Sequence, residues 1–124
     1  MRYLVDSNII IYHLNREPVA TDFLAKEYRH IAISQITFIE VLSFSFSDKE
    51  ESDVRKLLNT FKIIDIDTAI SNQAIENRKQ KKIKVPDNII LSTAMVHGLT
   101  LVTKNTKDFN AFDIKLLDPF EDIG

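Results

Sequence analysis

Short apolar runs alternate along this chain with longer segments of helical periodicity, and this alternation constrains its fold more than any other feature. Runs rich in aliphatic and β-branched residues are typical of buried strands. Such runs lie at residues 2–5, 31–33, 63–66, 99–103 and 114–117. Strands that alternate with helices favour an α/β fold with a mainly parallel sheet, in which ligands bind beyond the carboxyl ends of the strands.

The segments between these runs have the spacing of amphipathic helices. The clearest one covers residues 47–61, where apolar side chains recur at the i, i+3, i+4 and i+7 positions of one helical face. These side chains are Val54, Leu57, Leu58 and Phe61. Other helices are expected at residues 9–14, 23–28, 38–42 and 68–79, and from residue 85 to the glycine at 98.

The length and composition narrow the class of protein. A chain of 124 residues fits one domain, residues 1–124. It contains no cysteine, which excludes disulfides, zinc–thiolate sites and cysteine nucleophiles. No apolar run approaches the roughly 20 residues that span a bilayer, and Asp6 and Asn8 interrupt the only early one, so we expect a cytoplasmic protein. The net charge of -2 leaves a nuclease open, because acidic metal ligands cancel basic contacts in the sum.

Four acidic side chains stand beside the predicted strands. Asp6 directly follows the first run, and Glu40 lies in the helix after the second. Asp87 begins the helix before the fourth run, and Asp108 lies just past that run. In a parallel sheet these positions can converge on one rim. Carboxylates about 4 Å apart repel by roughly 4 kcal/mol per pair at an effective dielectric near 20, so a converged set needs a cation or large pKa shifts.

The chemistry of this set favours a hard divalent cation. Carboxylate oxygens suit Mg²⁺ or Mn²⁺, and the lack of histidine or cysteine among the four argues against zinc. An ion held in this way can activate water and neutralise charge on a phosphodiester. The predicted reaction class is therefore metal-assisted phosphodiester hydrolysis.

Each acid also has a purely structural interpretation. Asp6 is a favoured helix cap, and Asp87 complements the dipole at a helix N-terminus. Thr37 to Glu40 has the pattern of a capping box, in which the glutamate bonds back to the backbone of the cap residue. Asp108, taken alone, is more typical of a turn. The functional hypothesis depends on the four together and on their order.

The segments around the four acids resemble the motifs of PIN domains, especially those of VapC toxins. The motifs are Leu-Val-Asp-Ser-Asn-Ile-Ile-Ile-Tyr at residues 4–12, Ser-Gln-Ile-Thr-Phe-Ile-Glu-Val at 34–41, Asp-Asn-Ile-Ile-Leu-Ser-Thr-Ala at 87–94 and Leu-Val-Thr-Lys-Asn-Thr-Lys-Asp-Phe at 101–109. They occur in order over nearly the whole chain. The resemblance implies a three-layer α/β/α PIN-like fold with a mainly parallel central sheet, and RNA cleavage that depends on Mg²⁺ or Mn²⁺.

The resemblance also implies roles by position. The expected catalytic residues and metal ligands are Asp6, Glu40, Asp87 and Asp108, the last acting directly or through water. Asn8 and Thr103 would support these ligands by hydrogen bonding. Asn105 stands where many relatives carry aspartate, which implies a site that holds one ion at rest and gains a second with substrate. Expected partners are an RNA substrate, a second copy in a homodimer, and a cognate antitoxin whose arginine can replace the charge of the metal.

A basic run from Arg78 to Lys84 ends just before Asp87. The candidates for contact with RNA phosphates are Lys79, Lys81, Lys82, Lys84 and Lys104, with Lys107 as a further one. The alternative is a solvated helix end, where cations complement the dipole. Three aromatic residues lie within or just after the second motif and are interpreted as core or dimer contacts rather than as base-stacking platforms. They are Phe38, Phe44 and Phe46.

Two other functions compete with the nuclease. A receiver-like phosphoryl-transfer protein usually needs another acid beside Asp6, where Asn8 stands, and nucleotide chemistry usually needs a glycine-rich loop that this sequence lacks. A non-catalytic PIN-like RNA-binding module would be marked by the loss of acids, and all four positions are acidic. The nuclease is therefore the preferred hypothesis.

Overall fold

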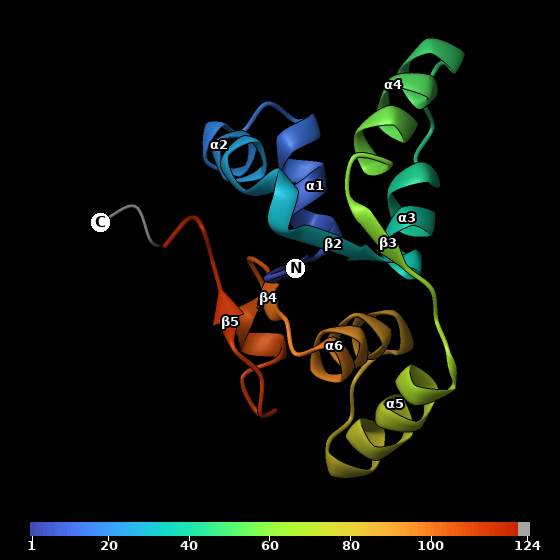
Figure 1. Ribbon diagram of the computed structural model, residues 1–124, viewed down its shortest axis with the longest axis vertical. Helices are drawn as coiled ribbons and strands as arrows, with labels where there is room; N and C mark the ends of the chain where they lie inside the picture. Colours follow the sequence, from blue (N-terminus) through green and yellow to red (C-terminus); the bar gives the residue numbers. More distant parts are fainter. Residues whose placement is uncertain (122–124) are drawn as a thin grey trace.

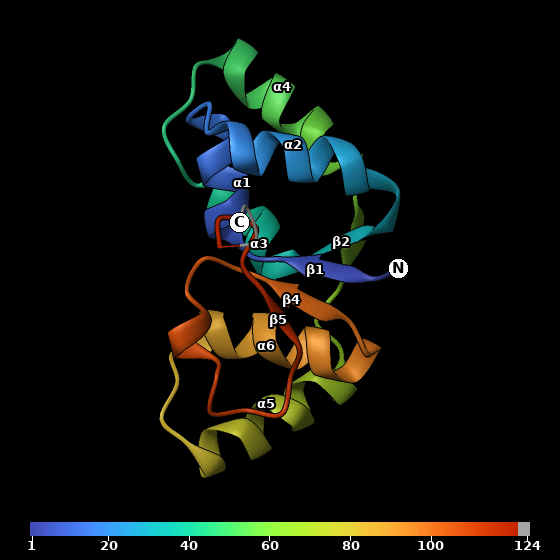
Figure 2. The same ribbon diagram turned by 90° about the vertical axis from the view of Figure 1, so that its left-hand side faces the viewer.

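The computed structural model describes residues 1–121 as a five-stranded sheet between two layers of helices (Figures 1 and 2). The strands are β1 (Tyr3–Val5), β2 (Ile31–Ser34), β3 (Lys62–Ile64), β4 (Thr100–Val102) and β5 (Leu116–Leu117). The helices are α1 (Ser7–Leu14), α2 (Pro18–Glu27), α3 (Gln35–Leu42), α4 (Asp48–Leu58), α5 (Thr68–Gln80) and α6 (Val85–His97). Two short 3₁₀ segments, η1 (Tyr28–His30) and η2 (Thr106–Asp108), complete these elements. The predicted α/β/α fold is confirmed.

The order of the strands reverses at β1. The sheet runs β3-β2-β1-β4-β5, and every neighbouring pair is parallel. From β1 the chain moves outward through β2 to β3, and then returns to add β4 and β5 at the other side of β1. The helices that precede β3 and those that follow it cover opposite faces of the sheet (Figure 2). The carboxyl ends of β1 and β4 therefore flank a topological switch point, where parallel sheets bind ligands.

Neighbouring residues on each central strand enter opposite cores. On β1, Leu4 packs with the α5–α6 layer through residues such as Ile90, whereas Val5 packs with Ile9 and Ile10 of α1. Side chains alternate along a strand, and a strand covered on both faces is apolar throughout. This double burial explains why the first apolar run shows no alternation of polar and apolar residues. Because β1 is buried on both faces, Asp6, which directly follows it, begins next to the core.

Helix α3 connects the two layers, because it contacts α1 and α4 as well as α6. Helix α6 ends at Gly98, whose left-handed backbone (φ 65°) terminates the helix as expected for a glycine in this place. Within residues 1–121, no helix has both the length and the apolar character needed to cross a bilayer.

Several element boundaries differ from those expected. Helix α1 begins at Ser7 rather than two residues later, because Asp6 caps it. Helix α2 begins at Pro18, well before the expected start, since proline is favoured in the first turn. Helix α4 ends at Leu58, and Phe61 enters the core from the connection that follows. Strand β3 is shorter than predicted, and Ile66 lies outside it with 40% of its surface exposed.

Candidate active site

The carboxylate of Asp6 is buried at the carboxyl end of β1. Its Oδ1 accepts a hydrogen bond of 2.7 Å from the backbone N–H of Ser7, and so caps α1. Its Oδ2 accepts a hydrogen bond of 2.8 Å from the hydroxyl of Thr103, directly after β4. The structural role and the functional one are therefore compatible, because each uses a different oxygen of the same side chain.

The Thr103 hydroxyl uses all of its hydrogen-bonding capacity at this point. Its single proton goes to Asp6, and its oxygen accepts from the side-chain amide of Asn8 at 3.2 Å and from the backbone N–H of Asn105 at 3.0 Å. The Asn8 oxygen in turn accepts from the backbone N–H of Lys104 at 3.3 Å. Asn8 and Thr103, both expected to support the acids, thus lie together with the backbone of Asn105, and these contacts fix the rotation of the threonine hydroxyl toward Asp6.

Glu40 reaches the site from the middle of α3. Its Oε1 accepts a hydrogen bond of 2.6 Å from the hydroxyl of Ser7, whose oxygen also lies 3.3 Å from the hydroxyl of Thr37. Helix α3 is capped by Ser34, which accepts from the backbone N–H of Ile36 at 3.2 Å. The capping-box interpretation of residues 37–40 is therefore wrong, because the helix begins before Thr37. The glutamate is free for another role.

The role of Ser7 was missed at the level of sequence. Its side chain is buried at the first position of α1 and connects the segment after β1 to Glu40, 33 residues later. The available signal was a small polar residue between Asp6 and Asn8 at the start of an otherwise apolar helix. That signal does not name the partner, because the contact is made across two separate elements.

The acids influence one another's ionisation. The pKa of Asp6 is raised to about 6, mainly by burial and also by the charges of Asp87 and Glu40, against the hydrogen bonds from Thr103 and Ser7. Burial also raises the pKa of Asp87, as do the charges of Asp108 and Glu40, while Lys84 lowers it. Because like charges act in this way only at short range, the four predicted acids form one electrostatic group.

The donor set suits a hard divalent cation, since it consists of carboxylate oxygens. None of the ion pairs found within residues 1–121 involves any of these acids. Yet no three acidic, histidine or cysteine side chains in that part of the chain stand close enough together to hold one metal ion. The chemistry of the residues therefore fits a metal site, while the carboxylates as they stand are spread more widely than ligands of one ion.

Comparison with known proteins decides the family. The PIN domain family matches residues 3–115 of this chain. The chain belongs to the PIN-domain family. Among similar proteins is "Ribonuclease VapC2" of Rickettsia felis, 32% identical over 98% of this chain and 99% of that protein. "Ribonuclease VapC10" of Mycobacterium tuberculosis is 31% identical over 94% of this chain and 92% of that protein.

The same family is found among solved structures. A chain from a "Toxin-antitoxin complex from Klebsiella pneumoniae" matches with a TM-score of 0.85 and 37% identity, over 94% of this PIN domain and 97% of that chain. The resemblance of the sequence motifs to PIN domains, and to VapC proteins in particular, is confirmed. The receiver-like alternative is accordingly wrong.

The lysine candidates of this PIN domain separate into two groups. A hollow of about 280 Å³ is lined by Lys81, Lys82, Lys84 and Lys107 together with Asp87 and Asp108. The remaining two lie elsewhere. Lys79 pairs with Glu76 on α5 at 3.6 Å, and the ammonium of Lys104 lies 4.5 Å from the ring centre of Phe120. Lysines that are close in the sequence therefore do not all lie in the same place in the fold.

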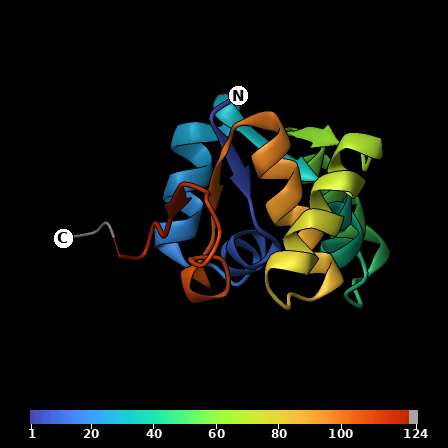
Figure 3. The same cartoon turned by 90° about the horizontal axis from the view of Figure 1, so that it is seen from below.

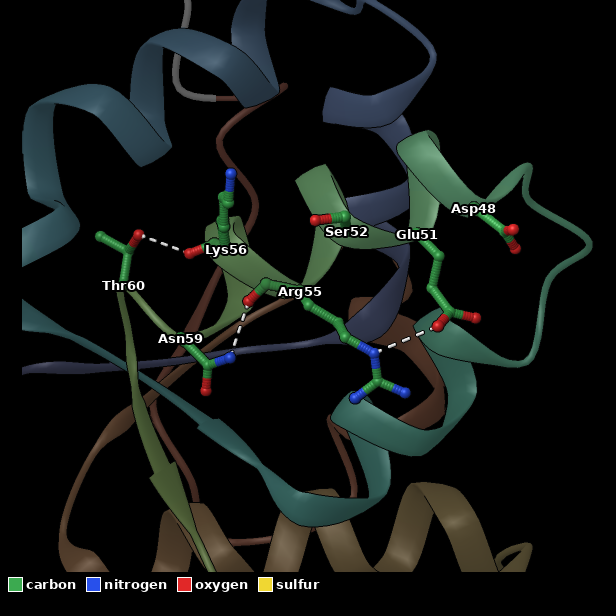
Figure 4. A pocket seen from close by; sticks show the side chains of 7 residues that line it. All are labelled: Asp48, Glu51, Ser52, Arg55, Lys56, Asn59 and Thr60. Atoms are coloured by element: carbon green, nitrogen blue, oxygen red, sulfur yellow. Dashed lines mark hydrogen bonds and ion pairs between the residues drawn. The ribbon is translucent and has the colours of Figure 1, made fainter.

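A larger hollow, of about 670 Å³, lies along α4 and contains none of the four acids (Figure 4). Its polar side chains bond to their own helix. Arg55 donates to Glu51 at 3.2 Å, Asn59 donates to the carbonyl of Arg55 at 2.9 Å, and Thr60 donates to the carbonyl of Lys56 at 3.0 Å (Figure 4). These pairs are those of a solvated helix face, so the size of this hollow carries no functional argument.

The three aromatic residues after the second motif also differ among themselves. Phe38 and Phe46 pack against the core on the α1 side of the sheet, which agrees with their interpretation as core residues. Phe44 has 52% of its surface exposed, with its ring centre 6.4 Å from that of Phe46. Phe44 is therefore available for contact with another molecule.

Proposed function

We propose that this PIN domain is an endoribonuclease that hydrolyses RNA phosphodiester bonds with Mg²⁺ or Mn²⁺, and that it is the toxin of a toxin–antitoxin pair. One observation carries the chemical part of this proposal. Asp6 and Asp87 have raised pKa values because of burial and because of the charges of the other predicted acids, which supports a common acidic site near the switch point of the sheet. A group of this kind attracts divalent cations, and its family relatives are named ribonucleases.

The proposed metal ligands are Asp6, Glu40 and Asp87. Asp108, which is exposed on η2, is assigned the fourth place, directly or through water. A bound ion would supply an activated water and positive charge beside the phosphodiester. Since Asn105 replaces an acid, we expect one ion in the resting protein and a second only with RNA.

The protein's own residues orient these ligands. Thr103 and Asn8 direct hydrogen bonds at Oδ2 of Asp6, and the hydroxyl of Ser7 holds one oxygen of Glu40. Groups of this kind determine which lone pairs of a ligand face the ion, and their loss typically costs 10–100-fold in metal affinity or activity. The contribution of Ser7 is positioning, because it touches a ligand rather than the substrate.

Partners and location belong to the same proposal. The similar Klebsiella pneumoniae chain is part of a toxin–antitoxin complex, and this supports a cognate antitoxin for the present protein. We further propose a homodimer and a cytoplasmic place of action, where RNA is available. Size measurement by light scattering tests the dimer. Co-purification with the product of a small neighbouring reading frame tests the antitoxin.

The decisive experiment is cleavage of purified total RNA. We expect fragments with Mn²⁺ or Mg²⁺, none with EDTA, and none from Asp6→Asn or Asp87→Asn. The control is Asp113→Asn, which removes an exposed acid outside the group and should cleave normally. Circular dichroism of each variant separates loss of chemistry from loss of fold. Cleavage by both site variants at the rate of the control would refute the site, and RNA binding without cleavage would leave a non-catalytic module.

The proposed role as a toxin is tested separately, by the growth of cells that express the protein. Induced expression in a bacterial host should arrest growth, and Asp87→Asn should relieve the arrest at equal protein level. Co-expression of the neighbouring antitoxin should relieve it as well. Growth arrest by both the wild-type protein and Asp87→Asn would mean that toxicity does not arise from RNA cleavage.

A further inference from the structure

We propose that the lysine hollow, formed by Lys81, Lys82, Lys84 and Lys107 beside Asp87 and Asp108, is the subsite for an RNA phosphate adjoining the one that is cleaved. The inference rests on the proposed ribonuclease function and deepens it, because it says on which side of the acids the RNA strand is held. It concerns phosphate recognition and not recognition of a base.

The hollow is built from two segments that are far apart in the sequence. Lys81, Lys82 and Lys84 belong to the connection between α5 and α6, while Lys107 belongs to η2 after β4. Seen from below, both segments lie at the end of the molecule toward which the arrow of β1 points (Figure 3). The fold therefore brings four lysines to the lining of one space, and not all of them come from the basic run.

The charge of the lining favours an anion. Four lysines against two aspartates leave a net charge of +2 when both carboxylates are ionised. A cation held by the acids would make the surroundings more positive still. None of the ion pairs seen within residues 1–121 uses these four lysines, although the charge of Lys84 acts on Asp87.

The size and lining of the hollow suit a phosphate. Its volume of about 280 Å³ exceeds the roughly 30 Å³ of one water molecule several-fold, so a phosphate and its remaining water fit. No aromatic side chain lines it, and Ile83 is its one apolar lining residue. Single-stranded RNA is usually read by stacking of bases on aromatic rings, whereas lysines contact phosphates without regard to sequence.

The positions of the other lysines indicate on which side of the acids the RNA strand passes. Lys104 does not line the hollow: its backbone N–H donates to Asn8, and its ammonium lies over the ring of Phe120. Lys79 is paired with Glu76 on α5. The lysines that share a space with the acids therefore lie beside Asp87 and Asp108, and the RNA strand next to the cleaved bond is expected to run past these two acids.

The test is binding of single-stranded RNA by an Asp6→Asn protein, which is expected not to cleave, over a range of salt concentrations. The probe is a fluorescent RNA of mixed sequence, followed by anisotropy. Lys82→Ala and Lys107→Ala should each weaken binding and reduce the slope of log K against log salt by about 0.7, and the double variant by about twice that. Lys82→Arg should restore most of the binding, because it keeps the charge.

Matched controls come from the amino ends of the two outer strands. Lys62 begins β3 and Lys115 precedes β5, and both are exposed, so Lys62→Ala and Lys115→Ala remove the same charge far from the carboxyl ends. Both should leave the salt slope unchanged. Equal effects of the hollow and control lysines would overturn the subsite, because the effect would then be one of net charge. An RNA with an abasic nucleotide beside the cleaved bond should be affected by Lys107→Ala as strongly as the intact RNA.

The outcomes separate this inference from the proposed function. If the wild-type protein cleaves RNA while the double variant binds and cleaves equally well, the ribonuclease stands and the subsite is refuted. If RNA binding depends on the hollow lysines but no divalent ion supports cleavage, the subsite stands and the ribonuclease falls. If the double variant loses only its antitoxin, the hollow is a protein-docking site and the proposal is wrong.

Discussion

The hydroxyl of Thr103 donates a hydrogen bond of 2.8 Å to Oδ2 of Asp6, across the two neighbouring strands where the order of the sheet reverses. The bond joins residues that are 97 positions apart in the chain. It opposes the effect of burial on the pKa of Asp6, and it leaves the aspartate in one defined orientation. The pKa of Asp6 therefore reports whether the contacts around this carboxylate are intact.

Replacing Thr103 by valine should reduce cleavage by about 10–100-fold, because a buried carboxylate loses its donor while the volume of the side chain is kept. The loss also raises the pKa of Asp6 further, so the rising limb of the pH–rate profile should move to higher pH. Thr103→Ser keeps the hydroxyl and is the matched control. An unchanged pH profile in Thr103→Val would show that the bond does not tune the aspartate.

The stability of the metal-free protein should fall as pH rises from about 4 to about 7. The pKa of Asp6 in the folded protein, about 6, lies above its ordinary value of 3.8, so the folded state binds more protons than the unfolded state in this window. The stabilisation is complete below the lower value and is lost as pH passes the upper one. The expected loss is about 1–3 kcal/mol, measured by denaturant unfolding in EDTA.

Asp6→Asn should remove most of this pH dependence, whereas Asp113→Asn should keep it. Mn²⁺ binds the ionised carboxylates, so it should raise the melting temperature of the wild-type protein more at pH 7.5 than at pH 5. The same pH dependence in Asp6→Asn and in the wild-type protein would contradict the assignment to this residue.

Ser7→Ala should lower the rate of cleavage about tenfold, since Glu40 loses the donor that holds its Oε1. The effect is expected in metal affinity more than in RNA affinity. It is checked by titrating activity with Mn²⁺, where excess metal should recover most of the rate. Ser71→Ala, at an exposed position of α5, is the control, and equal metal dependence of both variants would remove the positioning role.

A buried amide network joins α5 to α6 behind Asp87. The Asn77 amide donates to Oδ1 of Asn88 at 3.2 Å and to the hydroxyl of Ser92 at 3.0 Å, and the amide of Asn88 donates to the carbonyl of Ala74 at 2.8 Å. Asn77→Leu removes the amide that donates to Asn88 and Ser92 and accepts from Gln73, and should cost about 1–3 kcal/mol of unfolding free energy. Asn72→Leu, on the exposed part of α5, should cost less than half of that. Both free energies of unfolding are measured by urea titration.

The sequence predicted the order of strands and helices well, because the central strands are short apolar runs buried on both faces and α4 has a distinct apolar stripe. It also indicated that the four acids belong together, and the charges of three of them do raise the pKa of Asp6 or Asp87; their role as metal ligands stays a prediction. It could not distinguish a capping box at Thr37–Glu40 from a cap at Ser34, because both patterns satisfy the same local rule. The real capping box, Ser47 with Glu50, lies at the start of α4.

The contacts that sequence reasoning missed are all made between separate elements. Ser7 meets Glu40 across two helices, and Lys107 joins the lysines of the α5–α6 connection through the fold. No local pattern encodes such a meeting. Conversely, Lys104 was grouped with the other lysines by its neighbours in sequence, although its ammonium lies over Phe120.

The reversal of strand order has a consequence for how this protein is made. The acidic group needs Asp6, directly after the first strand, and Thr103 and Asp108 from beyond the fourth, so a ribosome must synthesise the chain past residue 108 before these residues can meet. A nascent polypeptide that stops short of β4 lacks the threonine hydroxyl that donates to Asp6. The ribosome that synthesises this protein is therefore not exposed to a complete site until the segment after β4 has been made.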